Sequence, residues 1–146
     1  MNSQATKVFF VQKTGEDSYE TEGIWCVKQG DYFILDNIPF VAKRVSLGDV
    51  IKAEYDSKDE AFYFDDFVAV SGNTTVRIHF HDPKMIFTAR KELELLGCES
   101  EAFLTRDLIA VNIPCSLSYA PVKQYLEEGE RNNYWVYDES CLAHEI

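Results

Sequence analysis

The stretch TVRIHFHDP, residues 75–83, decides the fold because it contains one strand and the start of one helix. Its apolar and polar residues alternate, a period of two that is typical of a β-strand with one buried face; the apolar set is Val76, Ile78 and Phe80. Asp82 and Pro83 then favour a helix start, because a carboxylate can cap free N–H groups and proline is tolerated in the first turn. We expect a strand over residues 75–80 and a helix over residues 83–96.

The rest of the second half continues this pattern with a hairpin, a second helix and a last strand. Gly97 is expected to end the first helix, while Ser118 and Gly129 are expected to cap and to end the second. The expected elements are strands over residues 98–104, 108–113 and 134–137 and a helix over residues 119–128. This β-α-β-β-α-β order is that of ferredoxin-like folds, in which two helices cover one face of a four-stranded antiparallel sheet.

Strand 75–80 directs alternate side chains to opposite faces of this predicted sheet. We expect the apolar set to face the two helices. The polar residues then lie on the opposite face, where they are candidates for contact with a partner: Arg77, His79 and His81.

The first half of the chain has short apolar runs between turn-forming residues and no convincing helical pattern. We expect strands over residues 7–13, 21–28, 32–35, 50–55 and 61–70. Short strands at spacings of about ten residues are typical of a compact antiparallel sheet or a small barrel. The predicted fold class is α+β, with a β-rich unit over residues 1–72 and a ferredoxin-like unit over residues 73–146. Each half alone has a small core, so we expect the two to pack as one globular body.

The charge of the chain excludes several classes of partner. Its 146 residues carry 25 Asp and Glu against 14 Lys and Arg, a formal net charge of −11 that is spread over both halves. Affinity for nucleic acids depends mainly on cationic side chains that displace counterions from phosphates, so DNA, RNA and anionic membranes are not expected as partners.

Other compositional features favour a cytoplasmic protein. The N-terminal residues are polar, without the basic and apolar regions of a secretory signal, and no apolar run is long enough to span a membrane. The four cysteines are far apart and form no C-x-x-C pair, so we expect separate core thiols: Cys26, Cys98, Cys115 and Cys141. The sequence leaves the oligomeric state open.

The motifs that usually indicate catalysis are absent from the sequence. His79, His81 and Asp82 are metal-ligand types, but a catalytic zinc needs a third protein ligand, and His144 near the C-terminus is the only histidine left. There is no G-x-S-x-G elbow and no Gly-rich phosphate loop. Asp65 and Asp66 would point to opposite faces of a strand unless a bulge intervened. We therefore predict no catalytic residue, no metal and no cofactor.

Five acidic residues instead mark a candidate surface for binding another protein: Asp56, Asp59, Glu60, Asp65 and Asp66. They lie within eleven residues, beside the aromatic run of residues 62–64, and only Lys58 offsets them locally. Charges that face a basic partner act together on the rate of association. The alternative interpretation is that the acidic residues lie on a solvated strand edge and that the aromatic residues belong to the core.

Three functions from different classes follow. The first is an acidic protein-binding module, specifically an immunity protein that neutralises a basic bacterial toxin such as a nuclease. The second is a small-molecule sensor, by analogy with other ferredoxin-like sheets. The third is an enzyme whose site residues the sequence does not identify, for example one assisted by a metal at His79 and His81.

The chain also resembles a bacterial family known only as a domain of unknown function. The segments that carry the resemblance are LDNIPF (35–40), SLGDV (46–50), TVR (75–77), LGC (96–98), YAPV (119–122), Trp135 and ESCL (139–142). Together they cover nearly the whole chain. The resemblance implies a small stand-alone protein of the bacterial cytoplasm, and it implies no activity, cofactor or catalytic residue.

Overall fold

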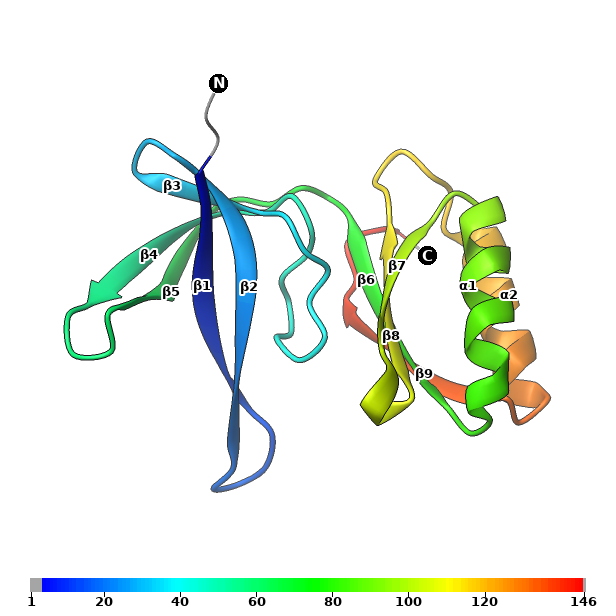
Figure 1. The fold of residues 1–146 in the computed structure, drawn as a ribbon. Coiled ribbons are helices and arrows are strands. Elements are labelled where there is room, and N and C mark those ends of the chain that lie inside the picture. The colour runs from blue at the N-terminus through cyan, green and yellow to red at the C-terminus, as the bar shows by residue number, and fades with distance from the viewer. Residues whose placement is uncertain (1–3, 146) are drawn as a thin grey trace. The chain divides into compact units, whose positions relative to one another are not determined.

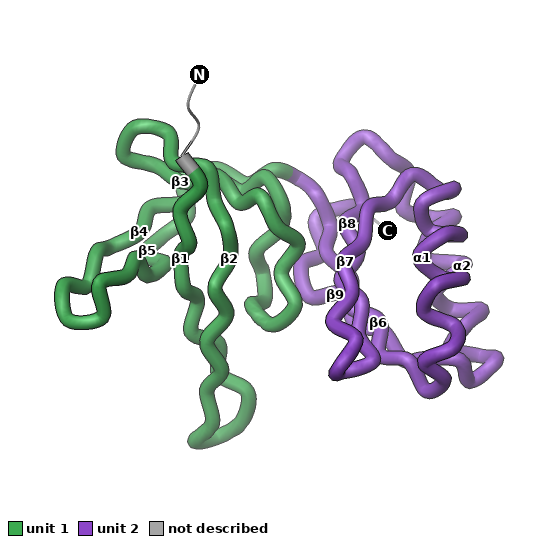
Figure 2. The backbone as a smooth tube through the Cα atoms, viewed as in Figure 1, with its two compact units in different colours: residues 1–71 green, residues 72–146 purple. Residues whose placement is uncertain are grey.

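The first half of the chain forms a closed barrel of five strands (Figure 1). These are β1 (Gln4–Lys13), β2 (Tyr19–Gln29), β3 (Tyr32–Leu35), β4 (Val50–Asp56) and β5 (Ala61–Ala69). The structure, a computed structural model, describes residues 4–145, and these fall into two units that divide between Ser71 and Gly72 (Figure 2). Of the two predicted alternatives for the first unit, the small barrel is the one found.

The barrel closes where its first strand meets its last. Strands that follow each other along the chain pair antiparallel, so an odd number of them brings β1 and β5 together in the same direction. This parallel pairing has two positions, Val8 with Phe62 and Phe9 with Tyr63. The inward side chains of the strands form the barrel core: Val8, Phe10, Ile24, Cys26, Phe33, Leu35 and Ile51.

Two carboxylates hold the long connection between β3 and β4. The Glu22 carboxylate accepts hydrogen bonds from the backbone N–H groups of residues 40–42 at 2.8 to 2.9 Å. Asp49, which is 2% exposed, accepts from the N–H groups of Ser46 at 2.9 Å and Ser71 at 2.8 Å. Hydrogen bonds to a charged acceptor are stronger than neutral ones, so these two side chains fix a loop that has no regular backbone pairing.

The second unit is a four-stranded sheet with two helices. Its strands are β6 (Thr74–Phe80), β7 (Glu99–Phe103), β8 (Leu108–Ile113) and β9 (Trp135–Cys141), in the order β7-β8-β6-β9 with all pairs antiparallel. The helices are α1 (Ile86–Leu95), which continues the short η1 (Pro83–Met85), and α2 (Ala120–Arg131); a turn, η2 (Leu104–Arg106), joins β7 to β8. Both helices lie on the same side of the sheet (Figure 1). The predicted β-α-β-β-α-β order of elements is confirmed.

The predicted facing of β6 is also confirmed. Val76, Ile78 and Phe80 are buried in one cluster with the apolar side chains of both helices: Ile86, Ala89, Leu93, Val122 and Leu126. The alternation of apolar residues in the opening stretch therefore decides which side of the sheet the helices cover.

Three of the predicted end signals differ in outcome. The Asp82 carboxylate accepts from the N–H of Lys84 at 3.0 Å, as predicted for a cap. Gly97 follows α1 with a φ of 102°, a conformation that favours glycine, so this prediction is confirmed too. Ser118 is expected to cap α2 but does not, because the helix begins one residue later, at Ala120. Tyr119 therefore occupies the N-cap, without a side-chain cap bond.

Gly129 does not end α2, which continues to Arg131. The residue is buried, and a Cβ atom built on it would lie only 1.9 Å from Cζ2 of Trp135. The indole Nε1 also donates to the carbonyl oxygen of Leu126 at 3.0 Å. Glycine is therefore required at this position by the close approach of β9 and not by the end of the helix.

The cysteines are all free thiols, and two of them are core residues as predicted. Cys26 and Cys98 are buried, whereas Cys115 is exposed and Cys141 is partly exposed. Cys115 was wrongly placed in the core because it lies just beyond the buried strand β8, after Pro114. Among residues 4–145, no helix is both long enough and apolar enough to cross a membrane.

The substitution Gly129→Ala tests the contact with Trp135. Alanine raises intrinsic helix propensity by about 1 kcal/mol, but the added Cβ must displace a packed ring, and overpacking of this kind costs about 1–3 kcal/mol or more. We expect a net loss of stability in urea unfolding followed by circular dichroism at 222 nm, a signal dominated by the helices of the second unit. Gln124→Ala, an exposed position in the same helix, is the control and should be near neutral. A stabilised Gly129→Ala variant would show that the ring does not constrain this site.

The buried thiols predict a loss of stability at high pH. Burial raises the pKa of Cys98 to about 11, while the thiol of the unfolded chain ionises near its ordinary value. Unfolding therefore releases a proton above that ordinary value, so stability is full below it and falls as pH rises toward about 11. The unfolding free energy measured at pH 8 and pH 10.5 should fall less in Cys98→Ala than in the native chain, by about 1–2 kcal/mol. Equal slopes in the native chain and in Cys98→Ala would contradict the prediction.

Candidate functional site

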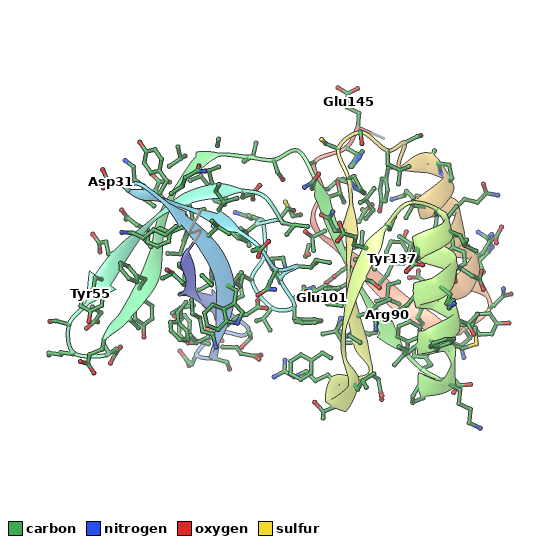
Figure 3. All side chains as sticks on the ribbon, turned by 45° about the horizontal axis from the view of Figure 1, so that its top comes forward. Asp31, Tyr55, Arg90, Glu101, Tyr137 and Glu145 are labelled. Atoms are coloured by element: carbon green, nitrogen blue, oxygen red, sulfur yellow. The ribbon has the colours of Figure 1, made fainter. Side chains whose placement is uncertain are left out.

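The predicted acidic residues all lie on the hairpin formed by β4 and β5. Residues 50–70 carry six carboxylates against two lysines. Tyr55, 56% exposed, lies near the tip of this hairpin (Figure 3). The hairpin therefore has a strong local excess of negative charge. The geometry of its carboxylates decides which of them bind groups of the hairpin itself and which are left exposed to solvent.

Two of the carboxylates shape the hairpin turn. Asp56 Oδ1 accepts from the backbone N–H groups of Lys58 at 2.8 Å and Asp59 at 3.2 Å. Asp59 Oδ2 accepts from the hydroxyl of Tyr63 at 2.9 Å, and this bond raises the pKa of Tyr63. Glu60 completes the turn with a φ of 51°. Asp56 and Asp59 thus have a structural role in the turn besides their charge.

Asp65 and Asp66 lie at a β-bulge. Lys52 of β4 pairs with Asp66, and the next residue, Ala53, pairs with Phe64, so Asp65 is an extra residue without a partner in β4. Both aspartates are exposed. A regular strand would direct them to opposite faces, whereas the bulge leaves both in solvent.

The aromatic residues of the hairpin divide between core and surface. Phe62 and Phe64 pack against the barrel core, and the Phe64 ring stacks on Phe10 with centroids 5.0 Å apart. Phe67 and Val68, directly after the two aspartates, are 38% and 40% exposed. Core packing is therefore the role of the first two phenylalanines, and an exposed apolar segment lies next to the bulge.

The three polar residues expected on one face of β6 are not assembled into a site. Arg77 makes a two-pronged ion pair with Asp138 of β9, with Nε–Oδ1 at 3.1 Å and Nη2–Oδ2 at 2.8 Å. His79 is exposed on the strand. His81 lies beyond the end of β6, in the bend before the Asp82 cap, and its Nδ1 is 3.1 Å from the carbonyl oxygen of Asn133. The strand ends at Phe80 as expected, and His81 therefore follows it directly.

The histidines do not form a metal centre. Within residues 4–145, no three His, Cys, Asp or Glu side chains gather in a way that could hold a metal ion. His144 is instead hydrogen-bonded through Nδ1 to the Thr74 hydroxyl at 2.6 Å and through Nε2 to the Pro114 carbonyl at 2.9 Å. A carbonyl only accepts, so Nε2 carries the proton and donates it.

A titratable cluster between α2 and β9 was missed by sequence reasoning. The Tyr119 hydroxyl and the Lys123 ammonium both donate to Glu139 Oε2, at 2.6 and 3.0 Å. Burial raises the pKa of Tyr119, and its bond to the Glu139 carboxylate adds to the rise. Tyr119 is only 3% exposed, and its bond to Glu139 joins the start of α2 to β9.

Tyr119 and Lys123 lie close together at the start of α2, but Glu139 lies 16 residues beyond Lys123, and no local motif links the three. Their only sequence signal is that Tyr119 and Glu139 belong to the YAPV and ESCL segments noted above.

Comparisons with known proteins support the resemblance in those segments. A crystal structure of a hypothetical protein from Neisseria gonorrhoeae is similar to this chain, with a TM-score of 0.81 and 25% sequence identity, over 99% of this chain and 100% of that one. No match is found among curated proteins. The model of one family, described as a domain of unknown function (DUF4265), matches residues 22–137. The predicted membership of a bacterial family of this kind is confirmed, and the chain belongs to the DUF4265 family.

Proposed function

We propose that this protein acts by binding another protein, and that the partner presents a basic surface to the β4–β5 hairpin. The observation that carries the proposal is the bulge at Asp65, which leaves two adjacent carboxylates in solvent beside an exposed apolar segment. Neither aspartate forms an ion pair with the facing Lys52 among the described residues. Their charge is therefore available to a partner.

The two kinds of side chain on this surface would have different roles in binding. Phe67, Val68 and Tyr55 supply apolar and aromatic area, which anchors the centre of many protein interfaces. The carboxylates contribute less to affinity, because exposed ion pairs are weak, and more to the rate at which a basic partner approaches. A partner with a cationic face around an apolar patch is the best complement.

A basic toxin that cleaves nucleic acid is a partner of this kind, since such an enzyme carries cationic residues for its phosphate substrate. The protein would then be the cytoplasmic immunity protein that neutralises it, a role that needs no catalytic residue. The acidic hairpin supports this proposal by charge alone.

We further propose that the second unit is ferredoxin-like. The support is its strand order. β8 pairs with one side of β6 and carries its hairpin partner β7 on the outside, and the last strand β9 pairs with the other side of β6.

The double substitution Asp65→Asn with Asp66→Asn tests the proposed surface. Proteins captured from a lysate of the source bacterium by the native chain would be compared with those captured by the variant. For the basic protein retained by the native chain, association kinetics would then be measured by biolayer interferometry. We expect the variant to associate about tenfold more slowly at low salt, with a smaller difference at high salt, because screening shortens the reach of surface charge.

The control is Glu16→Gln with Asp17→Asn, which removes two exposed charges from the β1–β2 turn of the same unit. It should associate like the native chain. Equal association rates for the native chain and both variants at low salt would contradict the proposal and leave the hairpin as a solvated edge.

A further inference from the structure

The two edges of the four-stranded sheet differ in how their backbone is covered. β7 forms one edge and β9 the other. At the β7 edge, Arg90 of α1 binds Ser100, with Nε donating to Oγ at 3.0 Å and Nη2 donating to the backbone carbonyl at 2.9 Å. An incoming strand that used this carbonyl would have to displace the Nη2 bond. The β7 edge is therefore blocked by a side chain, which is one way in which proteins protect exposed strands.

The β9 edge is covered much less firmly. His81 N–H donates to the Tyr134 carbonyl at 2.9 Å, and the antiparallel register continues with Val136 opposite His79. Groups that face the partner strand alternate with groups that face away, so the N–H and carbonyl of Tyr137 point outward. The Tyr137 N–H donates to Glu130 Oε2 of α2 at 3.4 Å, beyond the usual range for an N–H···O bond. A better acceptor can replace this carboxylate.

A groove of about 370 Å³ lies beside this outward backbone, between α2 and β9. Its lining residues are Glu127, Glu130, Arg131 and Tyr137. The half-buried Tyr137 ring packs against the core of the second unit and forms the apolar part of the groove. The groove thus places hydrogen-bonding backbone, an aromatic surface and charged side chains next to one another.

The groove is negatively charged. Glu127 and Glu130 line it, and among the described residues that line it Arg131 is the only cation. Burial is the largest cause that raises the pKa of Tyr137; Lys123, the next largest, lowers it, and the carboxylates of Glu127, Glu139 and Glu130 raise it. Lys123 itself donates to Glu139 at 3.0 Å.

We propose that the β9 edge accepts an extended, antiparallel strand from a partner protein, with Lys or Arg at alternate positions facing Glu127 and Glu130. The charge of the groove selects a cationic segment, and the outward groups of Tyr137 supply backbone hydrogen bonds, as in other cases of strand addition. A second copy of this chain does not fit, because its own β9 would bring the carboxylate of Glu139, on the helix side, toward the same carboxylates. The surface belongs to the second unit and does not depend on the β4–β5 hairpin.

The register determines which residues of the peptide face the groove. Residues directly opposite each other in an antiparallel pair share a face, and at every second pair the two residues exchange both backbone hydrogen bonds. Since the N–H and carbonyl of Tyr137 point outward, a strand added there makes its hydrogen-bonded pair at Tyr137. The peptide residue opposite Tyr137 therefore directs its side chain to the helix side, toward Glu127 and Glu130, and its own N–H toward β9. The lysines of the peptide are thus the residues whose backbone N–H groups bind the edge.

The experiment uses the full ¹⁵N-labelled chain and the synthetic peptide acetyl-TKVKTKVKT-amide. We expect amide shifts concentrated at Val136 and Tyr137 and their neighbours in β9. Glu127→Gln with Glu130→Gln should weaken binding by about tenfold, since two exposed charges are lost while the glutamine oxygen can still accept from Tyr137. Glu94→Gln with Glu128→Gln removes the same charge from exposed helix positions and should leave the affinity unchanged.

Two methylated peptides separate strand addition from simple charge attraction. N-methylation of the lysine backbone nitrogens keeps the charge but removes the donors that face β9, so binding should be lost. N-methylation of the threonine and valine nitrogens should leave it intact. Equal binding of both methylated peptides, shifts spread over the whole molecule, or equal loss in both glutamine variants would overturn the inference. Shifts confined to the β4–β5 hairpin would also overturn it, while supporting the function proposed above.

Discussion

The contact between the Trp135 ring and Gly129 fixes the geometry of the second unit. The ring occupies the space that a side chain at position 129 would need, and its N–H donates to the carbonyl of Leu126, so α2 and β9 are held at a short distance. The ring also packs against Phe80 of the neighbouring strand, with centroids 5.4 Å apart. The position of the last strand, its outward edge and the groove beside α2 all follow from this one packing arrangement.

Features that depend on neighbouring residues could be predicted from the sequence, and features that depend on distant residues could not. The alternation around Val76 and the cap at Asp82 are local, and both are confirmed. Gly129 was wrongly interpreted as a helix end, because its requirement comes from a tryptophan on another element. The bulge at Asp65 was also beyond local reasoning, since one extra residue in a strand is visible only when the partner strand is known.

The carboxylates of this chain have different structural roles, and the net charge alone does not show which carboxylate has which role. Glu22 and Asp49 bind backbone N–H groups and hold the long loop of the barrel. Asp65 at the hairpin and Glu127 at the groove are exposed and lie where a cationic partner can reach them. An acidic composition therefore reflects two separate demands, one for anchoring irregular backbone and one for an exposed negative surface.

The narrow parallel seam between β1 and β5 has a consequence for how the barrel assembles. Every other strand pair joins neighbours along the chain, so those pairs close shorter loops than the seam does. The seam joins the first strand to the last through two residue pairs, and closing so long a loop costs conformational entropy before any contact compensates for it. The entropy cost of loop closure therefore falls on the seam more than on any other strand pair of this barrel.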